Sequence, residues 1–486
     1  MGSTVASQPE GGSKRSTSAI VVTGLALFSM FFGAGNLIFP PMLAVEAGDN
    51  FWPALFGFLT TASLLPVLAV IAIALSGSNL RDLAQRAGSI FGVVFPVLAY
   101  LSIGAFYALP RTGAVSFETA ITPLFGFESF ASSGVFNVLF FGIALALSWN
   151  PTTIMEKLGK FLTPALLVLL VVMISVAAFR WSAEPAAPNE PYDDGPLTAG
   201  LLEGYLTMDS IAALAFSIVV ISTLRHRGFN EGKELVGGTI AAGVGAGIML
   251  GLVYIGLGLI GRVMPNAGEF DNGAGLLAEA ANLTMGGAGQ AVFSAIVLLA
   301  CLTTAVGLIT ATGEYFSEQF PGSYHVWAVI FAVTSMIIAT QGLEFVMTIA
   351  APVIGFLYPP AITLIALTLI EPAFRARTRF SWAFFLPLWT AVVWSAIETL
   401  ISLEWGADAL TPIVQWAPMF DAGLGWVVPV VIAFVIGLVV DFVRPKPAMI
   451  PGTMESVEGE DLSAEGDAVP VLQTLSLIHI SERAGK

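Results

Sequence analysis

The stretch Phe28-Ser-Met-Phe-Phe-Gly-Ala-Gly-Asn-Leu-Ile-Phe-Pro-Pro41 lies inside the first long apolar segment of the chain, residues 19–45. Glycines, an asparagine and two prolines so close together weaken or interrupt the hydrogen-bonded backbone of a helix. In hydrocarbon an unpaired peptide group costs several kcal/mol unless it is buried in protein or lines a cavity. Secondary transporters place such broken helices at the bilayer midplane, where they bind the solute. The stretch therefore predicts a carrier for a small solute.

The composition supports a membrane protein. The chain is 56% hydrophobic and 11% charged, with a mean hydropathy of +0.85, which excludes an ordinary soluble domain. Apolar runs of about 20 residues are long enough to cross a bilayer. Twelve such segments are predicted, at residues 19–45, 51–76, 89–110, 133–150, 161–180, 197–223, 235–261, 288–312, 324–340, 345–369, 381–402 and 424–442.

The placement of Lys and Arg predicts the orientation of these segments. An even number of crossings puts both termini on one side, and cytoplasmic loops carry an excess of Lys and Arg. With the N-terminus in the cytoplasm, only Arg111, Arg180 and Arg262 fall on the outer side, and the loop 313–323 carries neither residue type. We therefore expect cytoplasmic termini.

Charge and cysteine content indicate no further partner. The net charge of −15 comes from acidic residues in the outer loops and the C-terminal tail, where they are solvated, so no nucleic-acid partner is expected. The single cysteine, Cys301, excludes an intramolecular disulfide. No obligate protein partner is indicated.

The chain divides into three parts. Residues 1–18 are rich in Ser, Thr, Gly and basic residues and are expected to be a disordered cytoplasmic lead; residues 19–445 form an all-α membrane domain. Residues 446–486 are expected to be a cytoplasmic tail, whose last stretch is either a cloning remnant or a short interfacial helix.

An internal symmetry is suggested by the sixth segment, which carries Glu203-Gly-Tyr-Leu-Thr-Met-Asp-Ser210 inside an apolar run. The first and sixth segments are five apart and so cross in opposite directions. Interrupted segments at matching positions of two oppositely oriented halves indicate an inverted repeat with its binding site at the interface.

Three motifs together carry a family resemblance. Gly-Ala-Gly-Asn-Leu-Ile-Phe-Pro-Pro (33–41), Glu-Gly-Tyr-Leu-Thr-Met-Asp (203–209) and Leu-Thr-Thr-Ala-Val-Gly-Leu-Ile-Thr-Ala-Thr-Gly-Glu-Tyr-Phe-Ser-Glu (302–318) resemble the branched-chain amino acid:cation symporter family of bacteria over about 19–445. The resemblance implies a LeuT-like fold: a five-plus-five inverted repeat with discontinuous helices 1 and 6, and two extra helices. It also implies sodium-coupled uptake of leucine, isoleucine and valine in the bacterial inner membrane.

For an amino acid substrate, the first break is the expected carboxylate site. If Asn36 caps the outer half of the first segment, the free N–H groups from Ala34 onward and the helix dipole supply donors and positive potential. Gly33 and Gly35 let the backbone approach closely. Glycine also permits close helix packing, but packing alone does not account for the asparagine and the prolines.

The second break is the expected ammonium site. The unwound backbone at Leu206, Thr207 and Met208 would supply carbonyl acceptors, with the Thr207 hydroxyl as a further candidate. Asp209 is an acid within a membrane segment, so it would pair with substrate, cation or proton. It could equally pair with a neighbouring helix or cap the lower half of the sixth segment, and both interpretations stay open.

The resemblance also implies a sodium site between the first and eighth segments. Its ligands would be the carbonyls of Ser29, Phe32 and Ala300 and the hydroxyls of Thr303 and Thr304. Threonines in membrane helices also bond their own i−4 carbonyl. A second sodium, served by Asn36 and Thr207, is less well supported, because residues 235–261 contain no Asn or Gln.

Several alternatives and gaps remain. Met30, Phe31, Met208 and Phe216 are candidates for a side-chain pocket by adjacency alone, and Glu398 has no evident partner. A proton-coupled carrier, with Asp209 titrating, is the main alternative. An intramembrane enzyme lacks the His-Glu-x-x-His spacing, and a channel lacks repeated pore-forming units. The expected partners are an amino acid, sodium and the lipid bilayer.

Overall fold

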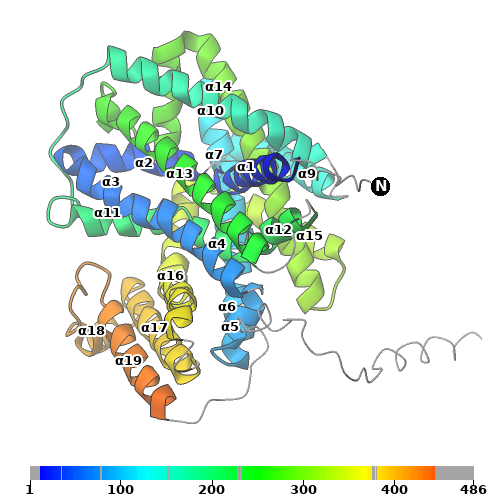
Figure 1. The fold of residues 1–486 in the computed structure, drawn as a ribbon. Helices are drawn as coiled ribbons and strands as arrows, with labels where there is room; N and C mark the ends of the chain where they lie inside the picture. Colours follow the sequence, from blue (N-terminus) through cyan, green and yellow to red (C-terminus); the bar gives the residue numbers. More distant parts are fainter. Residues whose placement is uncertain are drawn as a thin grey trace, which may run out of the picture.

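A computed structural model describes residues 11–33, 35–76, 79–149, 154–226, 229, 233–374, 378 and 380–443. Within these ranges every regular element is helical and there is no strand. Figure 1 shows the helices packed into one bundle, with α17, α18 and α19 gathered beside α16 at one edge. The elements run in this order: α1 (Gly11–Phe31), α2 (Gly35–Ala47), η1 (Gly48–Asn50), α3 (Phe51–Leu59), η2 (Thr60–Leu64), α4 (Leu65–Ser76), α5 (Leu80–Gln85), α6 (Ser89–Leu101), η3 (Ser102–Phe106), α7 (Ala108–Ser116), η4 (Phe117–Ile121), α8 (Thr122–Phe125), α9 (Phe130–Ser148), α10 (Ile154–Arg180), α11 (Pro196–Tyr205), α12 (Asp209–His226), α13 (Lys233–Val263), η5 (Ala267–Glu269), α14 (Gly273–Gln319), α15 (Tyr324–Thr340), α16 (Leu343–Phe374), α17 (Trp382–Ser402), α18 (Ala407–Val414) and α19 (Val427–Val443).

The helices agree with a multi-pass membrane protein. Seven helical stretches of the described chain have the length and apolar composition needed to cross a bilayer, and four shorter helices are also apolar. All twelve segments expected from the sequence fall on helices, the first on α1 and α2 and the sixth on α11 and α12. The prediction of an all-α membrane protein is confirmed, whereas the number of crossings and the repeat remain predictions.

Two expected boundaries are wrong. The helix α1 begins at Gly11, so residues 11–18 are helical rather than disordered. The third segment continues as helix past residue 110 to Phe125, through η3, α7, η4 and α8. Arg111 therefore lies within this helical segment and not in an outer loop. Residues 1–10 and 444–486 lie outside the described part of the chain.

Close backbone packing brings α11 against α3. An added Cβ at Gly200 of α11 would collide with the carbonyl of Ala54, and one at Gly57 of α3 would collide with the carbonyl of Leu197. Small residues at such crossings let helix backbones touch, which is the main source of attraction between helices in lipid. The first half of the sixth segment is thereby fixed beside α3.

The wide turn η2 connects α3 to three other helices. It is a π-helix, a rare form often found at functional sites. The Thr61 hydroxyl donates to the carbonyl of Leu201 in α11 at 2.7 Å, and the Thr61 carbonyl accepts from the Ser210 hydroxyl in α12 at 3.2 Å. The Ser63 hydroxyl donates to the carbonyl of Gly247 in α13 at 2.8 Å. A single turn of the second segment thus holds both halves of the broken sixth segment.

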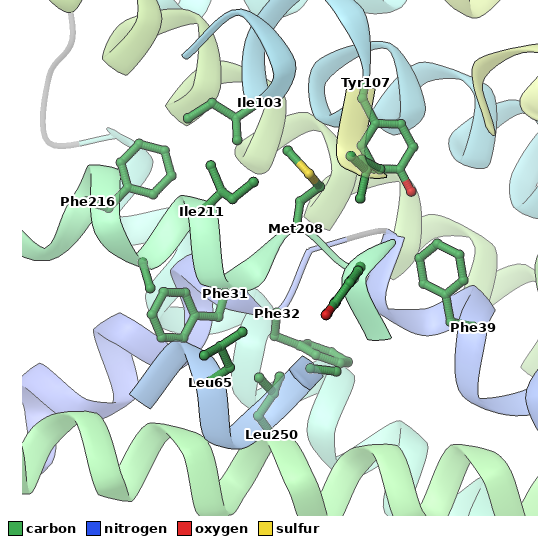
Figure 2. Packing of buried hydrophobic residues seen from close by; sticks show 14 of the residues in the cluster. Phe31, Phe32, Phe39, Leu65, Ile103, Tyr107, Met208, Ile211, Phe216 and Leu250 are labelled. Carbon is green, nitrogen blue, oxygen red and sulfur yellow. The ribbon is translucent and has the colours of Figure 1, made fainter. Parts of the chain in front are cut away.

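Apolar side chains surround the two breaks. Phe31, Met208 and Phe216 are 3%, 1% and 8% exposed, and Met30 is half-buried. They belong to one continuous core, part of which is drawn in Figure 2. The same burial is expected of ordinary core residues, so the side-chain pocket remains a prediction.

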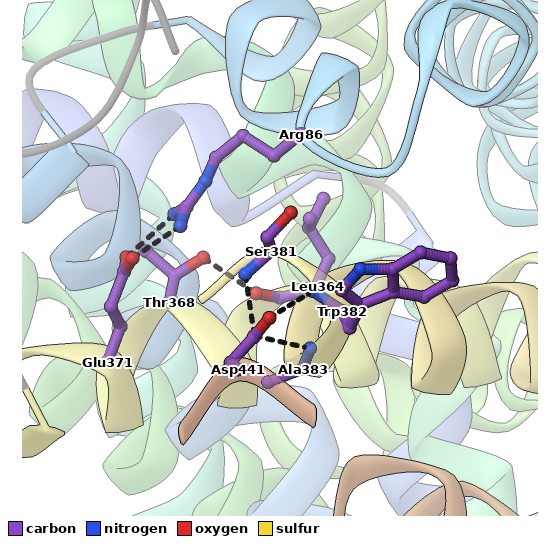
Figure 3. Close-up of polar contacts among 8 residues, drawn as sticks. All are labelled: Arg86, Leu364, Thr368, Glu371, Ser381, Trp382, Ala383 and Asp441. Atoms are coloured by element: carbon purple, nitrogen blue, oxygen red, sulfur yellow. Dashed lines mark hydrogen bonds and ion pairs between the residues drawn. The ribbon is translucent and has the colours of Figure 1, made fainter. Parts of the chain in front are cut away.

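The C-terminal helices are joined by a buried carboxylate. Asp441 of α19 accepts hydrogen bonds from the backbone N–H groups of Ser381, Trp382 and Ala383 at 2.8, 3.0 and 2.9 Å (Figure 3). These are the unpaired donors at the start of α17, where a negative charge also interacts favourably with the helix dipole. The residue fixes the end of α19 to the start of α17.

A buried ion pair fastens the end of α5 to the end of α16. The guanidinium of Arg86 and the carboxylate of Glu371 meet at 2.5 and 2.7 Å, with side chains 2% and 11% exposed (Figure 3). The guanidinium also lies 3.9 Å from the ring centroid of Phe384 in α17. The pairing is bidentate, the geometry that best offsets the cost of burying two charges.

Candidate functional site

The first break lies between the end of α1 at Phe31 and the start of α2 at Gly35. The N–H of Gly33 donates to the carbonyl of Phe31 at 2.8 Å, and the N–H of Asn36 donates to the carbonyl of Gly33 at 3.1 Å. Gly35 and Asn36 form the first turn of α2 and are buried. The break lies where the sequence predicts it, while Ala34, one of the expected donors, lies outside the described residues.

The second break separates α11 from α12 at residues 206–208. Leu206 and Thr207 form a turn, and Met208 has a φ of +65°, a left-handed conformation that is uncommon for residues other than glycine. Met208, Thr207 and Asp209 are 1%, 2% and 3% exposed. The Thr207 hydroxyl donates to the carbonyl of Gly204 at 2.9 Å. A strained, buried turn inside a membrane segment exposes backbone carbonyls to the protein interior rather than to lipid.

A direct contact joins the two breaks. The side-chain amide of Asn36 donates to both carboxylate oxygens of Asp209, at 3.0 and 2.9 Å, and to the carbonyl of Phe31 at 2.7 Å. The hydroxyl of Tyr254 in α13 donates to the same carboxylate at 2.8 Å. Asn36 therefore does not cap α2 through its side chain: it is the second residue of that helix and binds Asp209. Asp209 is therefore hydrogen-bonded to two neighbouring helices, α2 and α13, which is one of the roles left open for it above.

Arg111 is the functional candidate that the sequence reasoning missed. It is 5% exposed and extends from α7 to the second break. One terminal nitrogen donates to the Leu206 carbonyl at 2.7 Å and the Tyr107 hydroxyl at 2.6 Å, and the other donates to the Thr207 carbonyl at 3.2 Å. An added Cβ at Gly35 would collide with the guanidinium, which therefore lies against the start of α2.

A sequence signal for Arg111 existed. Pro110-Arg111-Thr112 is followed by further mostly apolar residues as far as Phe125, so the arginine lies inside a membrane segment rather than at its end. Ending the third segment at residue 110 hid this. A charged residue within a membrane segment is a functional candidate by default.

The proposed sodium ligands lie partly together. The hydroxyls of Thr303 and Thr304 donate to the carbonyl of Ala300 at 2.8 and 2.9 Å, which is the helix-internal bonding given above as the alternative. A Cβ on Gly33 would lie 3.4 Å from the Thr304 methyl and 3.6 Å from its hydroxyl oxygen. The first break therefore adjoins α14 at the expected position.

The remaining expected ligands, Ser29 and Phe32, lie at the end of α1 and directly after it, respectively. Hydroxyl oxygens that donate to a carbonyl keep lone pairs for a cation. No cluster of three or more His, Cys, Asp or Glu suited to a metal occurs among the described residues. Neutral oxygens of this kind suit a hard cation such as sodium, and the sodium site remains a prediction.

Comparisons with known proteins identify the family. The model of a family described as "Branched-chain amino acid transport protein" matches residues 16–444. The chain is 53% identical over 443 residues to the branched-chain amino acid permease BrnQ of Corynebacterium glutamicum, covering 91% of this chain and 99% of that protein. It is 36% identical over 431 residues to the branched-chain amino acid permease BraB of Bacillus subtilis, covering 88% and 96%.

Solved structures with low sequence identity share the fold. A nucleobase-cation-symport-1 family transporter, Mhp1, in a closed conformation with bromovinylhydantoin bound, superimposes with a TM-score of 0.56 at 14% identity and covers 90% of this chain and 92% of that chain. A mutant of the manganese transporter of Eremococcus coleocola gives 0.52 at 15% identity, covering 90% and 98%. The resemblance noted in the three motifs is confirmed, as is the prediction of a transport protein rather than an enzyme. The chain belongs to the branched-chain amino acid transport protein family.

Proposed function

We propose that this chain is a secondary active symporter that imports leucine, isoleucine and valine together with sodium. Membership of the family and the names of its relatives support branched-chain amino acids as the substrate class. The observation that carries the proposal is the contact between the two helix breaks through Asn36 and Asp209, with Thr304 beside the first break. Discontinuous helices that face each other are the arrangement by which carriers of this kind hold a solute.

The substrate would bind between the breaks. Its carboxylate would lie at the start of α2, near Gly35 and Asn36, where free N–H groups and the helix dipole favour an anion. Its ammonium would bind the carbonyls of Leu206 and Thr207. Its side chain would meet the apolar surface around Met208. Discrimination among the three amino acids depends on a methylene or a branch position, worth about 1–3 kcal/mol.

The coupling ion would bind at the ligands predicted from the resemblance. Sodium held there would stabilise the outward-open state, and its release inside would return the carrier. We assign twelve crossings in a five-plus-five inverted repeat with two extra helices, both termini in the cytoplasm and the protein in the bacterial inner membrane. Segments 1, 2, 6 and 7 would rock against segments 3, 4, 8 and 9.

Uptake into proteoliposomes tests this function. The purified full-length chain would be given radiolabelled leucine under an inward sodium gradient, then under a proton gradient without sodium. We expect uptake with sodium that valine and isoleucine inhibit and alanine does not. Uptake driven by protons alone would refute sodium coupling, and no uptake with either gradient would refute symport of leucine.

A proton-coupled carrier is the second candidate. The observation that favours it is the buried Asp209, whose carboxylate is held by Asn36 and Tyr254 between three helices. A carboxylate in such a place could carry a proton in place of the sodium ion. The two gradients in the same experiment separate these candidates.

The variant Thr304→Ala tests the sodium site. Removal of one hydroxyl ligand is expected to raise the sodium concentration for half-maximal uptake about tenfold, equivalent to about 1.4 kcal/mol. Leucine affinity at saturating sodium should change much less, because the substrate would bind mainly to other groups. The measurement is uptake against sodium concentration.

The matched control is Thr310→Ala. The Thr310 hydroxyl makes the same kind of helix-internal bond in α14, to the carbonyl of Val306 at 2.9 Å. This control should keep the sodium dependence of the wild type. If the Thr304 variant behaves like the control, the ion does not bind at Thr304.

A further inference from the structure

Arg111 is a buried cation whose hydrogen bonds are all with neutral groups, while the Asp209 carboxylate is near enough to interact with it electrostatically. Among the described residues its guanidinium makes no ion pair, and its hydrogen-bond partners are two backbone carbonyls and the Tyr107 hydroxyl. The ring of Tyr107 lies 4.4 Å from the guanidinium carbon, and the ring of Phe39 lies 5.6 Å away. A charge within a membrane segment is costly. A carboxylate bound directly to the guanidinium would stabilise it better than these neutral acceptors do.

The two carbonyls bound by Arg111 are those proposed for the substrate ammonium. The helix break leaves the carbonyls of Leu206 and Thr207 as acceptors. The guanidinium binds them at 2.7 and 3.2 Å, and the Tyr107 hydroxyl also donates to the Leu206 carbonyl, at 2.6 Å. The guanidinium thus stands in the structure where the positive end of an amino acid would stand. Substrate can take these acceptors only if Arg111 gives them up.

The proposed carboxylate position lies beside the same guanidinium. The lack of a side chain at Gly35 leaves room for Arg111 against the first turn of α2. An anion placed at the start of α2 would therefore lie within reach of the guanidinium, which could form two parallel hydrogen bonds with it. One arginine reaches both the ammonium acceptors and the carboxylate position.

We propose that Arg111 selects for zwitterions by exchanging partners. In the empty carrier it binds the carbonyls of Leu206 and Thr207; when an amino acid enters, the ammonium takes these carbonyls and Arg111 takes the carboxylate. The inference rests on the proposed substrate class and adds to it the residue that requires both charges. An amine without a carboxylate would displace Arg111 and leave its charge unpaired, so it binds poorly.

The test is equilibrium binding to the purified full-length chain in saturating sodium, measured by calorimetry. The probes are L-leucine, 3-methylbutylamine, which lacks the carboxylate, and 4-methylpentanoate, which lacks the amine. The wild type should bind leucine far more tightly than either analogue. The variant Arg111→Gln should bind the amine at least about tenfold more tightly than the wild type and leucine at least about tenfold more weakly, the range expected for a charged hydrogen-bonded contact.

Two further variants make the result specific. Arg262→Gln removes an arginine whose guanidinium lies 5.4 and 5.9 Å from the ring centroids of Phe51 and Trp52, outside the proposed site, and should keep the wild-type preference. Gly35→Ala retains the arginine, but the added methyl group should push its guanidinium off the carbonyls of Leu206 and Thr207. This variant provides the test if Arg111→Gln does not fold. It should also narrow the preference for leucine over the amine.

The outcomes separate the two proposals. An unchanged ratio of leucine to amine affinity in Arg111→Gln, or an equal loss for both ligands, overturns the exchange and leaves Arg111 a structural residue. Wild-type protein that binds none of the probes refutes the substrate class and the exchange together. Wild-type leucine binding with an altered ratio only in the Arg111 and Gly35 variants supports the exchange.

Discussion

Leucine uptake is expected to fall by more than about a hundredfold when Asp209 is replaced by asparagine. The carboxylate accepts hydrogen bonds from the Asn36 amide, at both of its oxygens, and from the Tyr254 hydroxyl. An asparagine keeps one acceptor oxygen but places an NH2 donor against these donors and removes the negative charge. A hydrogen bond to a charged group contributes about 1.5–3 kcal/mol, so losing one acceptor and the charge on the other at this junction is expected to misplace both breaks. Initial uptake rates in proteoliposomes with equal protein content measure this.

The matched control for Asp209→Asn is Glu398→Gln. Glu398 is an acid in α17 that does not belong to the Asn36–Asp209–Tyr254 junction, and the structure supplies the partner that the sequence did not: the indole N–H of Trp394 donates to it at 2.9 Å. Glutamine keeps a carbonyl acceptor for this bond, so uptake should stay close to that of the wild type. Wild-type uptake in Asp209→Asn itself would show that the junction is not needed for transport.

Removing the carboxylate of Glu371 is expected to produce the largest loss of stability. Glu371→Ala leaves the guanidinium of Arg86 buried without its anion, which costs about 3–5 kcal/mol. Thermal unfolding of the detergent-solubilised protein should therefore occur at a clearly lower temperature. The measurement is the unfolding midpoint at fixed protein and detergent concentration.

A double variant distinguishes the lost pair from a general packing defect. Arg86→Met with Glu371→Leu removes both charges and keeps apolar volume, an exchange that is often neutral or stabilising for buried ion pairs. It should recover most of the stability lost in Glu371→Ala. If Glu371→Ala unfolds at the wild-type temperature, the pair does not hold α16 in place.

The helix breaks could be predicted because their causes are local. Glycine, asparagine and proline change the backbone within a few residues of where they occur, and a lipid surrounding makes any interruption conspicuous. The first break follows from residues 33–36, and the second from the polar residues at 203–210. The family motifs then confined the candidate site to these two places and to α14.

The partners across the site could not be predicted, because they depend on contacts between distant segments. Nothing near Tyr254 marks it as the donor to Asp209, and the pairing of Arg86 with Glu371 joins residues 285 apart. Arg111 is an intermediate case. Its charge in an apolar run was visible, but its contact with the second break depends on where the fold places α7 relative to the sixth segment.

The π-turn η2 makes chain length, and not only residue identity, a condition for the site. Deleting one residue from 60–64 would close the wide turn into an ordinary α-helical one. Because a π-turn holds one residue more than an α-helical turn, the helix from Leu65 onward would keep nearly its original orientation, and the change would fall on residues 60–64 themselves. Thr61 and Ser63 could not both keep their bonds to the neighbouring helices. In the evolution of such carriers, substitutions within this turn should therefore be tolerated more often than insertions or deletions.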